Sequence, residues 1–324
     1  MVYNGVAQAA TCSASTPTIT AHSNTPNVCG YVTSNTSTAT SGCTPASNST
    51  VNLSADATYY AQTYKAAADG KVTFNPNGNS KFTYNSTDYT SATAIKICTI
   101  AATFNGTAQA STCSASITMP TITAASGFTT VGWTASSTGT DTATYTSGQT
   151  NVSLTSGSTW YAQSKKAAVT LTAKWDGNGA TLSSTSNTTC TIAAVYNGAS
   201  QGTSCQADAP TITRSGYTIT GFNDSASATT SNSAYNSSTN KITLTSALNN
   251  KTWYAVTSKQ VTFTYNPNGN TLSTPTGCSK DSSTGVVTCS CTIQNSATSC
   301  SVTSPTITAA TGFTKDGYSS GATT

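Results

Sequence analysis

The chain has 324 residues, of which more than a third are Ser or Thr and only 7% are charged. Its thirteen Lys and Arg are scattered without a basic run, which argues against nucleic acid as a partner. No stretch approaches the roughly 18 consecutive apolar residues of a membrane helix, and residues 1–10 lack the basic start and apolar core of a signal peptide. We therefore expect no membrane insertion in this segment, and an export signal, if there is one, outside it.

The residue pattern indicates strands throughout the chain. Thr, Val, Ile, Phe and Tyr occur in short runs, and Asn-Gly and Pro interrupt these runs. Such runs are typical of strands, and Asn-Gly is typical of tight hairpins. We predict an all-β fold, a tandem array of small β-grasp-like or β-sandwich-like repeat units, each pinned by a disulfide hairpin.

The chain is a repeat array. Residues 98–113, which begin and end with Cys, recur with few changes as residues 190–205, and their second half recurs as residues 3–12. The equivalent Cys12, Cys113 and Cys205 lie 101 and 92 residues apart, so each unit is large enough to bury its own core. The predicted units are 1–70, partial and lacking its first strand; 71–168 and 169–260, both complete; and 261–324, partial and lacking its last strand.

The units share further landmarks in chain order. A complete unit opens with a strand that enters an Asn-Gly turn, as in residues 72–79. A Pro-Thr-Ile-Thr strand follows the cysteine hairpin, and two Gly-aromatic pairs follow that strand. The unit closes on a strand of the type Thr-aromatic-Tyr-Ala. Its copies are residues 58–61, 159–162 and 252–255.

The cysteines lie symmetrically about the hairpin turns. In a hairpin with a two-residue turn, the turn determines which residues face each other. Cys98 and Cys113 each lie six residues outside the pair that flanks Asn105-Gly106, so we expect them to face each other across a paired ladder, at a distance that suits a disulfide. Two further pairs have the same symmetry, Cys190 with Cys205 about Asn197-Gly198 and Cys291 with Cys300 about Asn295-Ser296.

The remaining cysteines include two local pairs and one residue without a partner. We predict that Cys29 bonds to Cys43 and Cys278 to Cys289. By the same symmetry the partner of Cys12 would precede residue 1. Either the array continues beyond this chain, or Cys12 bridges to another chain.

Free thiols or a zinc site are the alternatives to these disulfides. Zinc sites usually contain tight Cys-x2–4-Cys pairs or several histidines, whereas His22 is the only histidine here. The chain has no tight cysteine pair except Cys289-Ser-Cys291. Disulfides are therefore favoured, and they imply an oxidising compartment. We predict no metal and no cofactor.

The shared landmarks carry a resemblance to a known family. Val-Thr-Phe-x-Pro-Asn-Gly, Pro-Thr-x-Thr-x-x-Gly-Tyr-x-x-x-Gly-Phe and Thr-Trp-Tyr-Ala resemble the Listeria-Bacteroides repeat, the B-repeat of internalin-type bacterial surface proteins. The resemblance extends over all four units and implies β-grasp-like beads on secreted or wall-attached proteins. The present units are longer and add the cysteine hairpin, which departs from the family pattern.

Candidate chemical sites are few. Trp133, Trp160 and Trp253 could form a sugar-stacking face, but each recurs at the same landmark of its unit, which favours core packing. His22 has no Asp nearby and there is no Gly-x-Ser-x-Gly motif, so we predict no enzymatic activity and no catalytic residue. Asp176 lies in Asp-Gly-Asn-Gly, which has too few acidic oxygens for calcium and is read as a turn.

These observations favour a structural role. We expect an extracellular, bacterial, cell-surface filament or stalk segment, whose partners are copies of itself or further repeats of the same chain. The partial end units then reflect either a window on a longer polymer or sheets completed by strands from neighbouring subunits. The alternative is an adhesin that binds glycans or a host surface through the variable loops Ser80–Lys96 and Asn223–Lys241.

Overall fold

The computed structural model describes residues 4, 5 and 7–320 of the chain. Strands and loops account for almost all of these residues, and their only helical element is a single 3-10 turn, η1 (Ser246–Leu248). The predicted all-β, disulfide-pinned fold is confirmed. The described residues form two compact units, one comprising the chain up to 167 together with 195–200, the other 168–194 together with 201–320.

The first unit contains the first two repeats and the tip of the third repeat's cysteine hairpin. Its strands are β1 (Cys12–Ser15), β2 (Asn27–Val32), β3 (Thr50–Leu53), β4 (Tyr60–Lys65), β5 (Ala68–Asn75), β6 (Lys81–Tyr84), β7 (Thr87–Tyr89), β8 (Thr93–Ile100), β9 (Thr103–Phe104), β10 (Ser114–Ile117), β11 (Thr121–Thr123), β12 (Thr129–Thr134), β13 (Val152–Thr155), β14 (Thr159–Lys166) and β18 (Val195–Tyr196).

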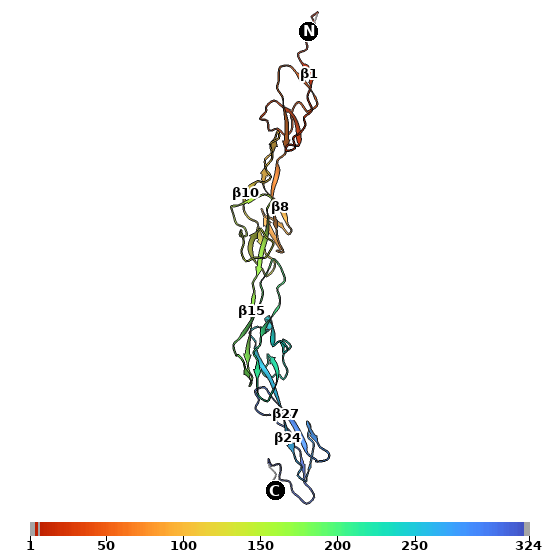
Figure 1. The fold of residues 1–324 in the computed structure, drawn as a ribbon, viewed down its shortest axis with the longest axis vertical. Helices are drawn as coiled ribbons and strands as arrows, with labels where there is room; N and C mark the ends of the chain where they lie inside the picture. The colour runs from red at the N-terminus through yellow and green to blue at the C-terminus, as the bar shows by residue number, and fades with distance from the viewer. Residues whose placement is uncertain (1–3, 6, 321–324) are drawn as a thin grey trace. The chain divides into compact units, whose positions relative to one another are not determined.

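The second unit contains the rest of the third repeat and the fourth. Its strands are β15 (Val169–Asp176), β16 (Thr181–Leu182), β17 (Thr188–Ile192), β19 (Ser204–Asp208), β20 (Ile212–Thr213), β21 (Thr218–Asn223), β22 (Tyr235–Asn236), β23 (Lys241–Thr245), β24 (Thr252–Tyr265), β25 (Thr271–Leu272), β26 (Cys278–Lys280), β27 (Val287–Gln294) and β28 (Ile307–Thr308). The long β24 lies beside β27 (Figure 1).

The last strand of a complete repeat lies in the middle of its main sheet. In the second repeat the order is β12-β14-β5-β8, so β14 pairs antiparallel with β12 and in parallel with the opening strand β5. In the third repeat β24 occupies the same position between β21 and β15. Each complete repeat therefore closes by placing its last strand against its first.

The cores of the two complete repeats use equivalent positions. In the second repeat Phe74 packs edge-on against Trp133, with ring centroids 5.1 Å apart. In the third repeat Trp175 and Phe222 make the same contact at 4.7 Å, with the two residue types exchanged. The tryptophan thus lies on different strands in the two repeats. Because each repeat has one Trp and one Phe at these two positions, the volume of the core is preserved.

The Pro-Thr-Ile-Thr landmark is a strand with one buried residue. Ile122 is buried while Thr121 and Thr123 on either side of it are exposed, as alternation along a strand requires. In the second repeat this short strand, β11, pairs with β6, and in the third β20 pairs with β16. These small sheets contribute Ile122 and Ile212 to the cores of their repeats.

Candidate functional site: the joint between repeats

The structure brings together the five cysteine pairs that the sequence suggests. Their Cα–Cα distances lie between 4.1 and 6.2 Å, and Cys12 is free and exposed. The pairs are Cys29–Cys43, Cys98–Cys113, Cys190–Cys205, Cys278–Cys289 and Cys291–Cys300.

The cysteine hairpins differ from the expected ladder. The Asn-Gly turn is present, because Asn105 and Gly106 both have positive φ (49° and 84°) and the Thr107 amide donates to the Phe104 carbonyl at 3.0 Å. Among the described residues, however, the two arms of this hairpin form no ladder with each other. The first arm, β9, instead pairs with β4, the last strand of the preceding repeat.

The same exchange of partners occurs in the next hairpin. Its first arm, β18, pairs with β14, with Lys165 opposite Tyr196 and Lys166 opposite Val195. The expectation of a self-paired ladder was wrong because the last strand of the preceding repeat offers free backbone donors and acceptors beyond its own sheet, and the hairpin arm takes them. The cysteine pair then closes the hairpin at its base.

An asparagine at the tip of each hairpin binds the preceding strand through its backbone and side chain together. The Asn197 amide donates to the Ser164 carbonyl at 3.0 Å, and the Ser164 amide donates to Asn197 Oδ1 at 2.9 Å. Ser164 is fully buried, so both of these backbone groups would otherwise lack a partner. We call this arrangement the asparagine clasp, comprising the tip Asn and the strand residue that it binds.

The asparagine clasp recurs at all three joints. Asn105 makes the two bonds with Thr63 at 2.9 and 3.1 Å. Asn295 makes them with Thr257 at 2.8 and 3.1 Å. The contact depends on main-chain groups of the receiving strand, so it does not require one particular receiving residue, and Thr, Ser and Thr fill that position.

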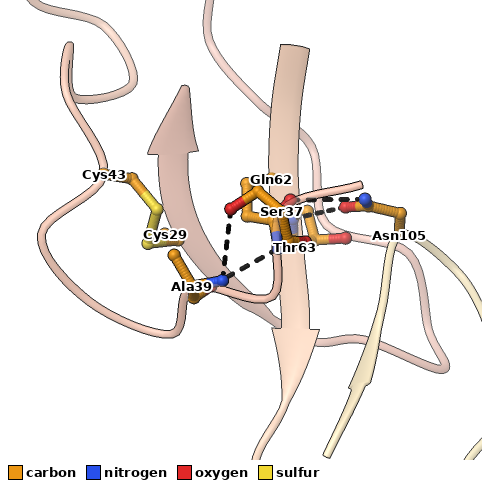
Figure 2. Close-up of a disulfide and its surroundings, with 7 residues drawn as sticks. All are labelled: Cys29, Ser37, Ala39, Cys43, Gln62, Thr63 and Asn105. Carbon is orange, nitrogen blue, oxygen red and sulfur yellow. Dashed lines mark hydrogen bonds between the residues drawn. A yellow bond between two sulfur atoms is a disulfide. The ribbon is translucent and has the colours of Figure 1, made fainter. Parts of the chain in front are cut away.

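The strand residue just before the one that the tip asparagine binds connects the clasp to a loop of the preceding repeat through further hydrogen bonds. Asn105 Nδ2 donates to Gln62 Oε1 at 3.3 Å, and Gln62 Nε2 donates to the Ser37 carbonyl at 3.0 Å (Figure 2). That loop is the one closed by the Cys29–Cys43 disulfide (Figure 2). The clasp therefore ties a hairpin tip to a disulfide-bonded loop through one buried glutamine.

The other two joints show the same role with different residues. Gln163 accepts from Asn197 at 2.8 Å and donates to the Ser136 carbonyl at 2.8 Å. At the third joint the equivalent residue is Val256, and Asn295 Nδ2 reaches the loop directly, donating to the carbonyls of Ala226 and Ala228 at 3.0 and 2.8 Å. The loop is bound in all three cases.

Glycine allows the hairpin tip to approach the preceding repeat closely. Gly198 lies against Gly78 of the opening turn, and a Cβ on Gly198 would lie 2.4 Å from the Gly78 carbonyl oxygen. Both residues have positive φ (75° and 81°). Side chains are excluded here by space and by backbone conformation together.

Charged groups surround two of the joints. The Tyr196 hydroxyl donates to Asp141 Oδ1 at 2.6 Å, and Lys165 binds the same carboxylate at 2.8 Å. These bonds raise the pKa of Tyr196 and of Lys165, and the Lys165 bond lowers the pKa of Asp141. At the third joint the Arg214 guanidinium donates to the Asn295 carbonyl and lies 3.7 Å above the Tyr217 ring.

The other residues that the sequence suggested as candidate binding or catalytic sites lie in the core, at a joint or in a turn. Trp133 and Trp253 are fully buried, and Trp160 is partly buried against the core. His22 lies beside Gly106 at the first joint, where its imidazole accepts from the Asn24 amide at 3.1 Å. Asp176 caps a turn by accepting from the Asn178 amide at 2.7 Å. Among the described residues, no group of three potential metal ligands comes together.

The two segments that the sequence suggests as variable loops carry part of the cores. Residues 80–96 contain β6 and β7, and their Phe82 is fully buried between Phe74 and Trp133. Residues 223–241 contain β22, and Tyr235 packs edge-on against Phe222 at 5.6 Å. These segments are therefore only partly free for recognition.

Sequence reasoning missed the receiving half of the clasp. A signal for it exists, because Gln follows Tyr-Ala at Gln62 and Gln163, directly after the closing strand motif. The third copy has Val256 instead, which obscures the pattern. The tip asparagines were noticed only as turn residues.

Among the described residues, no helix is long and apolar enough to cross a membrane. No protein-family model matches the chain, and no curated protein or solved structure is significantly similar to it.

Proposed function

We propose that this chain is a non-catalytic structural segment of an extracellular filament, stalk or surface appendage, built by end-to-end extension of its repeats. The observation that carries the proposal is the asparagine clasp at Asn105, Asn197 and Asn295. A joint that recurs with the same two backbone bonds at three successive positions is a device for propagating an array.

The arrangement of the joint suits a chain that extends repeat by repeat. Each clasp joins a hairpin tip to the closing strand of the repeat before it, so it always runs in one direction along the sequence. A contact of this kind can be repeated from each unit to the next along an array. The disulfide at the base of each hairpin holds the two arms together, so the tip stays in position to bind the preceding strand. On the chain-entropy model, a disulfide that closes a 15-residue loop stabilises the folded state by about 3 kcal/mol.

The same features support an extracellular location. Five disulfides in a chain of this size are typical of oxidising compartments. The resemblance of the landmarks to the Listeria-Bacteroides repeat of bacterial surface proteins supports the same assignment.

Immunogold electron microscopy of the producing cells tests this function. Antibodies against the purified chain are expected to label extended structures outside the cell. Label confined to the cell interior, or to soluble secreted protein with no filament or stalk, would contradict the proposal. A glycan array run with the same protein addresses the adhesin alternative, for which saturable binding would be required.

A further inference from the structure

The turn that follows each Pro-Thr-Ile-Thr strand keeps its backbone but varies in its first residue. In the first three repeats the amide of the fourth turn residue donates to the carbonyl of the first, at 2.9 to 3.3 Å. These turns are residues 22–25, 125–128 and 214–217. Their first residues are His22, Ala125 and Arg214, which include the only histidine and the only arginine of the chain.

The first residue of this turn lies at the joint with the next repeat. If the tip glycine of the following hairpin carried a Cβ, that atom would lie 3.4 Å from the His22 ring at the first joint and 3.6 Å from Ala125 Cβ at the second. At the third joint Arg214 donates to the Asn295 carbonyl and, at 2.9 Å, to the Thr257 hydroxyl. A constant turn therefore presents a different side chain at each joint.

At the third joint this turn belongs to a cationic cluster, which we define as Arg214, Tyr217 and Lys259. The Arg214 guanidinium carbon lies 3.7 Å from the centroid of the Tyr217 ring, and Lys259 Nζ lies 5.9 Å from the same centroid. Within the part of the chain that the structure describes, neither cation forms an ion pair. Two like charges beside one ring repel each other, and a bound anion would relieve that repulsion.

The cationic cluster has hydrogen-bond donors to spare. A guanidinium has five N–H groups and an ammonium has three. Both side-chain hydrogen bonds of Arg214 come from Nη1, so among the described residues its Nε and Nη2 groups have no acceptor. Lys259 is exposed and Arg214 is half-buried. The cluster therefore offers two positive charges and several free N–H groups to a ligand from solution.

We propose that the cationic cluster binds a carboxylate group of an acidic polysaccharide. The planar guanidinium pairs with both oxygens of a carboxylate, and the ammonium adds a second charge. The half-buried Tyr217 ring gives the sugar an apolar surface beside the charges. Nucleic acid is disfavoured, because no basic run accompanies the cluster.

The inference goes beyond the proposed function, since it adds a binding site to a structural array. The cluster also lies outside the two segments of the adhesin alternative, residues 80–96 and 223–241.

The second repeat provides an internal comparison. It has an equivalent ammonium and ring, Lys166 and Phe128, but its turn begins with Ala125. Without the guanidinium we expect no carboxylate site there, and therefore one site at the three joints. Because alanine already occupies this turn position in the second repeat, Arg214→Ala is expected to fold.

Titration of the full chain with an oligogalacturonate at low salt, followed by NMR, tests the inference. The amide resonances of Ser215, Gly216 and Lys259 report on the cluster. A neutral galactose oligosaccharide of the same length, sodium acetate and an oligoglutamate peptide are titrated in parallel. The neutral sugar tests the need for charge, and the other two present a carboxylate without the sugar.

Two cluster variants and one control complete the experiment. Arg214→Ala removes the guanidinium, and Lys259→Glu reverses the second charge. Lys251→Glu makes the same charge change at an exposed lysine of the same repeat, outside the cluster. Hydrogen exchange at the Thr257 amide, which donates to Asn295 Oδ1 at 3.1 Å, checks that the joint stays closed in each variant.

The parent should bind the oligogalacturonate saturably at one site, and more weakly as the salt concentration rises. Arg214→Ala and Lys259→Glu should each raise the Kd at least about tenfold, because charged hydrogen bonds are lost or a like charge is introduced. Lys251→Glu should stay within about twofold of the parent, since its charge is screened from the site by solvent and salt.

The inference is overturned if the parent does not bind, if the neutral sugar binds equally well, or if the two cluster variants bind like the parent. Acetate or oligoglutamate that binds as tightly as the oligogalacturonate would reject a polysaccharide as the partner. These outcomes are separate from those of the proposed function. A chain that binds no sugar but labels extracellular filaments would reject only the site, and sugar binding together with intracellular label would reject only the proposed function.

Discussion

Asn197 and Ser164 satisfy each other's hydrogen-bonding groups. One amide and one carbonyl of Ser164 are bound by the backbone and side chain of a single asparagine, at 2.9 and 3.0 Å. Asparagine suits this role because it tolerates the positive φ (54°) that the turn needs and carries an oxygen at the reach required. Turn formation and attachment to the preceding repeat therefore depend on the same residue.

Replacing Asn197 by Gly should weaken this joint without straining the turn, since glycine accepts the positive φ. The buried Ser164 amide would lose its acceptor, which costs about 1 to 3 kcal/mol. Hydrogen exchange read at the Ser164 amide is the direct measurement, and it should become faster. Asn151→Gly is the matched control, because Asn151 also has positive φ (58°) but is exposed and away from any joint. Unchanged protection of the Ser164 amide in Asn197→Gly would refute the clasp.

The disulfide pattern predicts a simple labelling result. Iodoacetamide added to the denatured, unreduced chain should modify one thiol, that of Cys12, and after reduction it should modify all eleven cysteines. Peptide mass spectrometry without reduction should recover Cys98 joined to Cys113 and Cys190 joined to Cys205. More than one reactive thiol before reduction, or cross-joined pairs, would show that the hairpins are not closed as described.

Gly70 should not accept a side chain. A Cβ at this position would lie 2.2 Å from Cys113 Sγ and 2.7 Å from Cys98 Sγ, so the disulfide packs directly on the glycine. Overpacking of this kind costs roughly 1 to 3 kcal/mol. Gly70→Ala is expected to lower the stability measured by urea unfolding by about that amount.

Gly202→Ala is the control for this substitution. Gly202 also lacks a positive φ, and the nearest atom to its added Cβ is 3.6 Å away, an ordinary contact. It should unfold close to the parent. Equal stability of the Gly70→Ala and Gly202→Ala variants would mean that the disulfide does not rest on Gly70.

Asp281 predicts a pH dependence in the fourth repeat. Its carboxylate accepts from the Ser283 hydroxyl at 2.7 Å and from the backbone amides of Ser283 and Thr284, and these bonds lower its pKa to about 2. A group with a lowered pKa stabilises the folded state above its ordinary value of 3.8. That contribution is lost as the pH falls through the lowered pKa.

Carboxyl-carbon NMR should place the midpoint of Asp281 near 2. The Ser283 and Thr284 amide resonances should move together with it as the turn loses its acceptor. In Asp281→Asn the same amides should show no titration in this range. A midpoint near 3.8 would mean that the turn bonds are not formed in solution.

Local rules were sufficient for much of the fold. Asn105-Gly106 and Asn197-Gly198 lie at the turns that these dipeptides predict, and the cysteines symmetric about them lie within disulfide distance. Trp133 and Trp253 each belong to a landmark that recurs in the other units, which indicated core positions, and both are fully buried. Each of these features depends on residues close together in sequence or repeated along it.

The partners of the hairpin arms could not be found in that way. The arm containing Phe104 pairs with the strand containing Tyr64, and nothing near Phe104 in the sequence favours that strand over the other arm of its own hairpin. Residues 80–96 were expected to be a variable loop, yet Phe82 lies fully buried among aromatic rings. Pairing between distant strands depends on which edges are free once the sheets have formed.

The sequence alone therefore determined the repeat, the positions of its turns and the cysteines available to each hairpin, because turn conformation and strand alternation are properties of neighbouring residues. The tertiary structure decided where each hairpin tip goes. Asn197 reaches Ser164 only because the closing strand of one repeat extends past its own sheet and presents unpaired backbone groups. Every residue except proline has a backbone amide, so no residue type marks the receiving half of the joint. It could be recognised only in three dimensions.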